Sequence, residues 1–147
     1  MKIWIDGDAC PNPIKEVIFK ASMRKKLQCI IVANQFIQIP PSPFIQRQIV
    51  EQGFDVADNA IVQQVAQNDL VITADIPLAN DVVEKKAIAI NPRGQLYTIE
   101  NIKQKLAMRN FNESLRETGM QHSTHAKFST KDIQQFSNQL DRLLAKI

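Results

Sequence analysis

Five aspartates in the first part of the chain stand where carboxylates could gather at one site: Asp6, Asp8, Asp58, Asp75 and Asp81. Four of them end or closely follow short apolar runs, and Asp81 lies in the segment after the last of these runs. Open parallel sheets bind ligands at the carboxyl ends of their strands, where such residues would converge. A rim of carboxylates repels itself unless cations neutralise it, and oxygen ligands without paired His or Cys favour Mg²⁺ or Mn²⁺ over zinc. The spacing therefore predicts a divalent-metal site.

Divalent ions held by carboxylates have a defined use in phosphodiester hydrolysis. They bridge the phosphodiester, lower the pKa of an attacking water and stabilise the leaving oxygen. This chemistry needs no nucleophilic side chain. The lack of a convincing Cys–His or Ser–His–Asp arrangement in the sequence is therefore compatible with catalysis.

Helix capping is the alternative explanation for some of these carboxylates. Asp58 and Asp75 each stand just before an expected helix, where aspartate is a favoured N-cap worth about 1 kcal/mol. Capping does not explain Asp6, because a turn separates it from any helix. Nor does it explain Asp81 in a helix interior, where aspartate is a mediocre helix former. A clustered site accounts better for the whole set.

Four further residues are candidates for substrate contact. Arg93, in a loop after the last strand of the core, could hold a phosphate through its planar guanidinium or close a turn. Asn34, at the end of the second strand, could orient a water or a base, or serve the turn. Ser42 and Arg47 flank a proline-rich loop and could meet substrate.

The elements that would position these residues follow from the spacing of apolar residues. We predict strands over residues 2–5, 29–33, 54–57, 70–73 and 87–90. We predict helices from Pro13, with Asn12 as N-cap, over residues 44–52, after Asp58 or Asn59, and through Pro77. This alternation implies an α/β fold: a three-layer, open, mostly parallel sheet of about five strands with helices on both faces.

The last third of the chain differs in pattern. Residues 100–117 form a helix in this interpretation, and residues 120–128, which lack an apolar period, form a loop. Ser129 and Thr130 then open a last helix with a stripe of apolar residues. We therefore expect one domain over residues 1–147, with a sheet core over 1–91 and a helical extension over 92–147 packed on it.

Composition limits the class of protein. The 147 residues include 44% hydrophobic and 22% charged residues, which excludes disorder and collagen-like character. Two cysteines are too few for a disulfide framework, so a reducing compartment is expected. The longest apolar run, residues 29–33, is far too short to span a membrane. These features predict a cytoplasmic domain with no membrane contact.

The net charge of +3 is unevenly distributed. Residues 1–91 carry nine Lys and Arg against ten Asp and Glu, a balance of −1, whereas residues 92–147 carry nine against five, a balance of +4. A basic segment of this size fits contact with nucleic acid and could supply phosphate contacts, but it is also common in proteins that touch none.

The run IWIDGDACP at residues 3–11 strongly resembles the opening of the YaiI/YqxD family of bacterial proteins. Gly7 stands there where many relatives carry alanine, and both flanking aspartates are in place. The resemblance extends over nearly the whole chain. Further matches cover residues 32–35, 53–58, 69–79, 91–94 and 101–102, with Tyr97 and, in the last helix, Phe136, Asn138, Leu140, Asp141 and Arg142.

That family resembles a branch of the PIN-like superfamily, whose members are typically metal-dependent ribonucleases with a Rossmann-like sheet. The resemblance implies that Asp6, Asp58 and Asp75 are the core metal ligands. It also implies that Asp8 and Asp81 are additional ligands or orient water. With the positions of the acids, it leads to our main hypothesis of a Mg²⁺- or Mn²⁺-dependent phosphodiesterase that acts on RNA.

Two other functions are compatible with the sequence. A strand that ends in Asp-x-Asp also opens haloacid-dehalogenase-type phosphatases, with Asp6 as nucleophile and Asp8 as general acid. The short chain, Cys10-Pro11 after the pair and the lack of late paired aspartates count against this. Alternatively, the domain binds RNA or a protein without catalysis and holds only a structural ion. A homodimer is compatible with the exposed edges of such a sheet, although no segment marks an interface.

Overall fold

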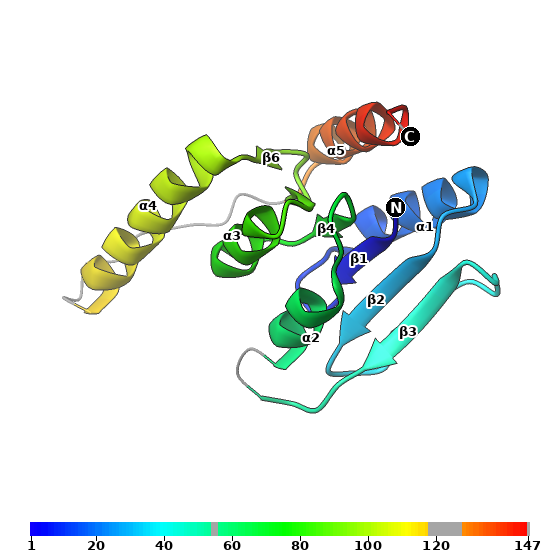
Figure 1. Cartoon of the computed structure of the whole chain (residues 1–147), viewed down its shortest axis with the longest axis horizontal. Coiled ribbons are helices and arrows are strands. Elements are labelled where there is room, and N and C mark those ends of the chain that lie inside the picture. The colour runs from blue at the N-terminus through cyan, green and yellow to red at the C-terminus, as the bar shows by residue number, and fades with distance from the viewer. Residues whose placement is uncertain (54–55, 118–127, 147) are drawn as a thin grey trace.

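The structure is a computed structural model that describes residues 1–53, 56–117 and 128–146 of the chain (Figure 1). Within these ranges, one six-stranded sheet comprises β1 (Ile3–Asp6), β2 (Cys29–Ala33), β3 (Ile45–Ile49), β4 (Leu70–Ile72), β5 (Ile88–Ile90) and β6 (Leu96–Tyr97). The helices are α1 (Asn12–Lys25), α2 (Val56–Gln64), α3 (Ile76–Glu84), α4 (Ile99–Glu117) and α5 (Thr130–Leu144). The loop expected at residues 120–128 lies outside the described residues except for its last position.

The strands are ordered β3-β2-β1-β4-β5-β6, and β1 to β5 run parallel to one another. Only β6, among the described strands, runs antiparallel to its neighbour. This is the strand order of doubly wound dinucleotide-binding folds. The predicted α/β class with an open, mostly parallel sheet is confirmed. The sixth strand was missed because its two residues carry too little pattern to predict a strand.

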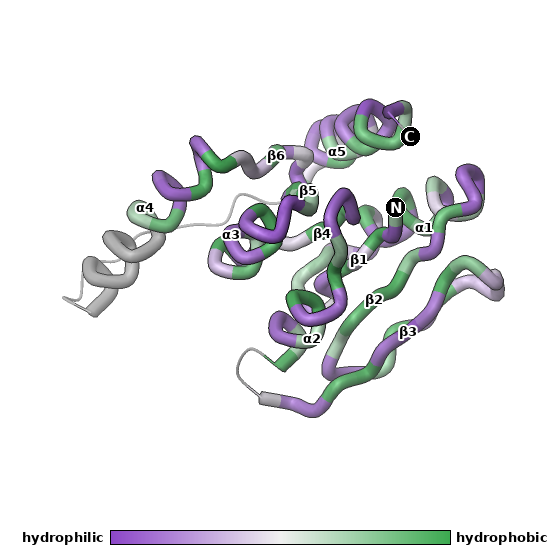
Figure 2. Tube along the Cα trace, in the orientation of Figure 1, coloured by the Kyte–Doolittle hydropathy of each residue, from purple (hydrophilic) through white to green (hydrophobic). Residues whose placement is uncertain are grey.

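Two hydrophobic clusters cover the two faces of the sheet and make three layers. Ile3 and Ile5 of β1 pack with α1 and α5 on one face, and Trp4 between them packs on the other face with α2, α3 and the start of α4. This alternation follows from the pleat, which turns successive side chains to opposite faces. Figure 2 shows an apolar β2, which is buried on both sides, and an α5 that alternates between apolar and polar residues.

Local signals place the starts of α3 and α5 correctly. The cap of α2 expected at Asp58 or Asn59 is wrong, because α2 begins at Val56 and both residues lie within it. Asp75 caps α3, and Pro77 lies in its first turn as predicted. Ser129 caps α5 in a capping box with Asp132. The expected N-cap of α1 is wrong by one position, because Asn12 is already the first helical residue and Pro11 precedes it without a side-chain cap.

The segment after β2 departs from prediction. Residues 44–52, expected to be helical, contain β3 instead, which pairs in parallel with β2. Its sequence IQRQI suits an edge strand, and pairing with β2 satisfies backbone groups that a helix would have satisfied internally. The crossover between the two parallel strands is thus residues 34–44, which contain bends and a turn but no helix and include the expected proline-rich loop.

The strand expected at residues 54–57 is also wrong where it can be compared. Val56 and Ala57 form the first turn of α2, and residues 54 and 55 lie outside the described residues. The apolar run was short enough to suit either element, and the helix buries Ile61 against the sheet.

The C-terminal helices lie on both sides of the sheet. The predicted apolar stripe of α5 packs near α1, and Phe136, Leu140 and Leu144 are fully buried there. Gly94, with a φ of 88°, allows this approach, because a Cβ at that position would lie 2.7 Å from the carbonyl oxygen of Gln135. Over the described residues, we find no helix with the length and apolar composition that crossing a bilayer requires.

Candidate functional site

The candidate site lies where β1 and β4 end side by side at the carboxyl edge of the sheet. β1 leads through α1 to β2 on one side of it, whereas β4 leads through α3 to β5 on the other. The chain therefore diverges between these two strands, which is the position where open α/β sheets bind ligands. Asp6 is the last residue of β1, and Thr73 and Asp75 directly follow β4.

A buried hydroxyl connects the two strand ends. Thr73 Oγ1 donates a hydrogen bond to Asp6 Oδ2 at 2.9 Å and accepts one from the backbone N–H of Asp75, also at 2.9 Å. Thr73 is 1% exposed and Asp6 is 6% exposed. Thr73 thus holds the Asp6 carboxylate in one orientation and sets the backbone at Asp75. Nothing in the sequence distinguishes Thr73, because a threonine at the end of an apolar run is an ordinary strand residue.

Electrostatics at Asp6 disfavour its charged form. Burial raises the pKa of its carboxyl group, the hydrogen bond from Thr73 opposes this, and the nearby charges of Asp75 and Asp8 raise it further. Within the described part of the chain, no Lys or Arg forms an ion pair with any of these three aspartates. A cation bound beside them would relieve this repulsion.

Asp75 combines a structural contact with a place in the acidic set. Its Oδ1 accepts a hydrogen bond from the backbone N–H of Leu78 at 2.9 Å, so the predicted N-cap is confirmed. Its charge also acts on Asp81 in α3. The pKa of Asp81 is raised mainly by burial, next by the charge of Glu84 and least by the charge of Asp75, whereas a hydrogen bond with Asn80 lowers it. Capping and membership of a charged cluster are both features of Asp75.

Asp8 joins the end of β1 to the end of β2. Its Oδ2 accepts a hydrogen bond from the backbone N–H of Asn34 at 2.9 Å. Between the two aspartates, Gly7 is packed closely, since a Cβ there would lie 2.8 Å from Ile31 Cγ1 and 2.9 Å from Ile37 Cδ1. The structure therefore brings the predicted residues Asp8 and Asn34 together, although the contact uses the main chain of Asn34.

Asp58 occupies a different environment from the other candidate ligands. It is half-buried in the first turn of α2, and it is not among the charges that perturb Asp6. Over the described residues, no three His, Cys, Asp or Glu side chains are grouped closely enough to hold an ion. The arrangement of Asp6 and Asp75 fits the way proteins commonly bind Mg²⁺, with one or two carboxylates and the remaining positions taken by water and substrate oxygens.

Tyr97 of β6, like Thr73, lies near the carboxyl edge of the sheet and was not among the candidate residues. Burial raises its pKa, a hydrogen bond with Asn91 opposes the shift, and the charge of Asp75 adds to it. Its phenol is therefore a neutral group within electrostatic reach of Asp75. The only sequence signal was its place among the residues that match the family.

The other predicted substrate contacts are engaged elsewhere. Arg93 Nη1 donates to Asp132 Oδ2 at 2.6 Å, and its guanidinium lies 5.0 Å from the ring centre of Phe128, so it fastens the loop after β5 to the start of α5. Ser42 Oγ accepts from the backbone N–H of Phe44, just before β3 and hence at the opposite edge of the sheet. Arg47 lies within β3, and its guanidinium stacks over Phe36.

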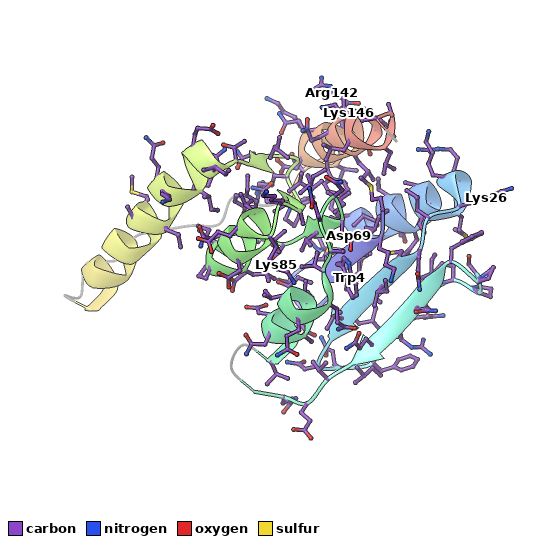
Figure 3. All side chains as sticks on the ribbon, viewed as in Figure 1. Trp4, Lys26, Asp69, Lys85, Arg142 and Lys146 are labelled. Atoms are coloured by element: carbon purple, nitrogen blue, oxygen red, sulfur yellow. The ribbon has the colours of Figure 1, made fainter. Side chains whose placement is uncertain are left out.

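A second buried carboxylate shows what a purely structural aspartate looks like in this fold. Asp69 is 5% exposed, and three donors are bonded to it: the Trp4 indole N–H at 3.1 Å and the backbone N–H groups of Lys2 and Ala66 at 2.9 Å. Figure 3 shows Trp4 beside Asp69. Asp69 precedes β4 and lies at the amino edge, with its hydrogen-bonding capacity used by the fold, unlike Asp6.

Comparison with known proteins agrees with the sequence resemblance. A UPF0178 protein of Marinomonas sp. (strain MWYL1) is 58% identical over 146 residues, which cover 99% of this chain and 98% of the relative. A UPF0178 protein of Shewanella amazonensis is 56% identical over 147 residues, 100% of this chain and 99% of the relative. No solved structure matches the chain significantly. A family model described as "Uncharacterized BCR, YaiI/YqxD family" matches residues 4–146, and the chain belongs to this family.

Proposed function

We propose that this protein is a Mg²⁺- or Mn²⁺-dependent phosphodiesterase of the PIN-like type that hydrolyses RNA. One observation carries the proposal: a buried carboxylate, Asp6, faces the charges of Asp75 and Asp8 at the edge where β1 and β4 diverge. Among the described residues, no basic side chain pairs with them. Such an uncompensated acidic set favours a bound cation over an empty site.

In this proposal the side chains have different roles. Asp6 and Asp75 are the metal ligands, and Thr73 positions Asp6 through the hydrogen bond to Oδ2. Asp58, in the first turn of α2, is the third proposed metal ligand. Asp8 and Asp81 orient water at the rim. The bound ion would supply Lewis-acid chemistry, lowering the pKa of water and stabilising the leaving oxygen.

The first test is metal-dependent cleavage of single-stranded RNA. Wild-type protein should cleave in Mg²⁺ or Mn²⁺ and not in EDTA, and Asp75→Asn should lose most of the activity. Asp141→Asn is the matched control, because this carboxylate pairs with Arg24 on the surface, far along α5. Cleavage by Asp75→Asn at the wild-type rate would refute the proposal.

The second test separates catalysis from simple binding. Titration calorimetry with Mn²⁺ should show weaker binding for Asp6→Asn than for wild type. Equal binding would favour a module that binds RNA or protein without a catalytic ion. Trapping a phosphorylated Asp6 would instead identify a haloacid-dehalogenase-type phosphatase.

A further inference from the structure

A long groove lies between α1 and the non-helical crossover segment that joins β2 to β3. It has a volume of about 870 Å³. One wall is residues 35–41 of the crossover, and the other is one face of α1: Asn12, Lys15, Glu16, Phe19, Lys20 and Met23. From Asn12 to Met23 the helix advances about 17 Å, at 1.5 Å per residue. The groove exists because the crossover contains no helix, since a packed helix there would have filled it.

The groove adjoins the turn between Asp6 and Asp8. Asn34, the first residue of the crossover, donates its backbone N–H to Asp8. Ile37, which lines the groove, lies against Gly7, because a Cβ there would be 2.9 Å from Ile37 Cδ1. A chain lying in the groove would therefore reach the turn that carries Asp6 and Asp8.

An aromatic side chain is exposed to solvent on the wall formed by the crossover. Phe36 is 68% exposed, although a phenyl ring of this size is usually covered in a folded domain. The guanidinium of Arg47 lies 4.3 Å from the ring centre and also donates to the carbonyl oxygen of Ile37 at 3.3 Å. Arg47 is not among the residues that line the groove, whereas Phe36 is. Arg47 thus contacts the Phe36 ring from outside the groove, and the ring itself lines the groove.

The helix wall adds positive charge. Lys15 and Lys20 line the groove and form no ion pair with a described acid, whereas Glu16 on the same wall carries one negative charge. With Arg47 behind Phe36, the balance of these charges is positive. Aromatic platforms that stack bases, next to cationic side chains that follow a phosphate backbone, are typical of proteins that bind single-stranded nucleic acid.

We propose that this groove binds a single-stranded segment of the RNA substrate, with a base stacked on Phe36 and phosphates near Lys15 and Lys20. The proposal deepens the function proposed above and rests on it for the identity of the ligand. Base-paired RNA does not fit this mode, because stacking on an isolated ring needs an unpaired base. The groove would lead the strand to the carboxylates at the sheet edge.

The test measures binding in EDTA, where cleavage does not contribute. Fluorescence anisotropy with a labelled ten-nucleotide single-stranded RNA should show tight binding by wild type and a roughly 5- to 150-fold loss in Phe36→Ala. The control is Ile99→Ala on α4, because Ile99 is 66% exposed and far from the groove in sequence and fold. A duplex RNA should bind more weakly than the single strand.

The lysines are tested by salt dependence. Replacing both Lys15 and Lys20 by Gln should reduce the slope of log affinity against log salt by about 1.4, since each phosphate contact on a single strand contributes about 0.7. The double variant Lys103→Gln and Lys131→Gln has the same net charge and changes exposed residues of α4 and α5. An equal effect in both double variants would show a general charge effect and overturn the assignment of phosphates to the groove.

The outcomes separate this inference from the proposed function. Loss of binding in Phe36→Ala supports the groove even if no metal-dependent cleavage is found. Wild-type affinity in Phe36→Ala, no binding by wild type, or equal binding of duplex and single strand overturns it even if Asp75 proves essential for cleavage.

Discussion

The substitution Thr73→Val tests whether the buried hydroxyl joins the two halves of the candidate site. It removes the hydrogen bond to Asp6 Oδ2 and the one accepted from the backbone N–H of Asp75, and it changes the side-chain shape little. A hydrogen bond to an ionised group contributes about 1.5–3 kcal/mol, and a neutral one about 0.5–1.5 kcal/mol. The added methyl group recovers up to about 0.8 kcal/mol. We therefore expect a loss of about 1–4 kcal/mol in the free energy of unfolding at pH 8.

The size of this loss should depend on pH. The pKa of Asp6 is raised in the folded state, so the folded protein binds this proton more tightly than the unfolded chain. The resulting stabilisation is fully present below the unfolded pKa and is lost as pH rises through the folded pKa. Thr73 opposes the rise in the pKa, so its removal makes the charged form still less favourable. The difference between wild type and Thr73→Val should therefore increase from pH 5 to pH 8.

Urea denaturation in EDTA, followed by circular dichroism, measures this difference. Thr130→Val is the control, because Thr130 is exposed at the start of α5 and its loss should change stability by less than about 0.5 kcal/mol. A Thr73→Val protein within about 0.5 kcal/mol of wild type at pH 8 would refute the hydrogen-bond chain. A difference that stays constant with pH would refute the link to an ionised Asp6.

Three further predictions concern the scaffold. Gly94→Ala should lower the free energy of unfolding by about 2 kcal/mol or more, because it combines a positive φ with a clash against α5. Gly53→Ala, where a Cβ would meet only the Val56 side chain, at 2.9 Å, and φ is not positive, should cost less in the same urea titration, and equal losses would contradict this expectation. Asp69→Asn should destabilise by about 1–3 kcal/mol and alter the emission of the single tryptophan, whose indole N–H it binds, yet leave any RNA cleavage intact. Burial raises the pKa of Cys10 and of Cys29 to about 12, so Ellman's reagent should react slowly with native protein at pH 8 and quickly after unfolding. Rapid labelling of both native thiols would show that the hydrophobic cluster around them opens.

Helix starts were predictable because their signals are local. The Asp75 cap with Pro77 in the first turn, and the capping box of Ser129 with Asp132, join residues only a few positions apart. The spacing of these residues in the sequence is therefore enough to predict the geometry of the helix caps. The apolar stripe of α5 was predictable for the same reason, because positions three and four apart share one helix face.

The conversion of residues 45–49 into a strand was not predictable from the chain around them. Five residues of mixed polarity suit a helix as well as an edge strand, and pairing with β2 decides between them. That pairing also makes the crossover a segment without a helix and leaves the groove beside it. The three prolines predicted a loop, but they gave no indication that this loop would lead directly into a strand.

Apolar periodicity was enough to place Asp6 and Asp75 at or just after strand ends, because it locates the ends of β1 and β4 to within one residue. Which carboxylates meet depends on the tertiary fold. Asp6 and Asp75 are far apart in the chain and come together because β1 and β4 are neighbours in the sheet. Thr73 acquires its contacts from the same pairing, whereas Asp58 is carried on a helix over one face. Strand order is set by packing between distant segments, and no local pattern contains it.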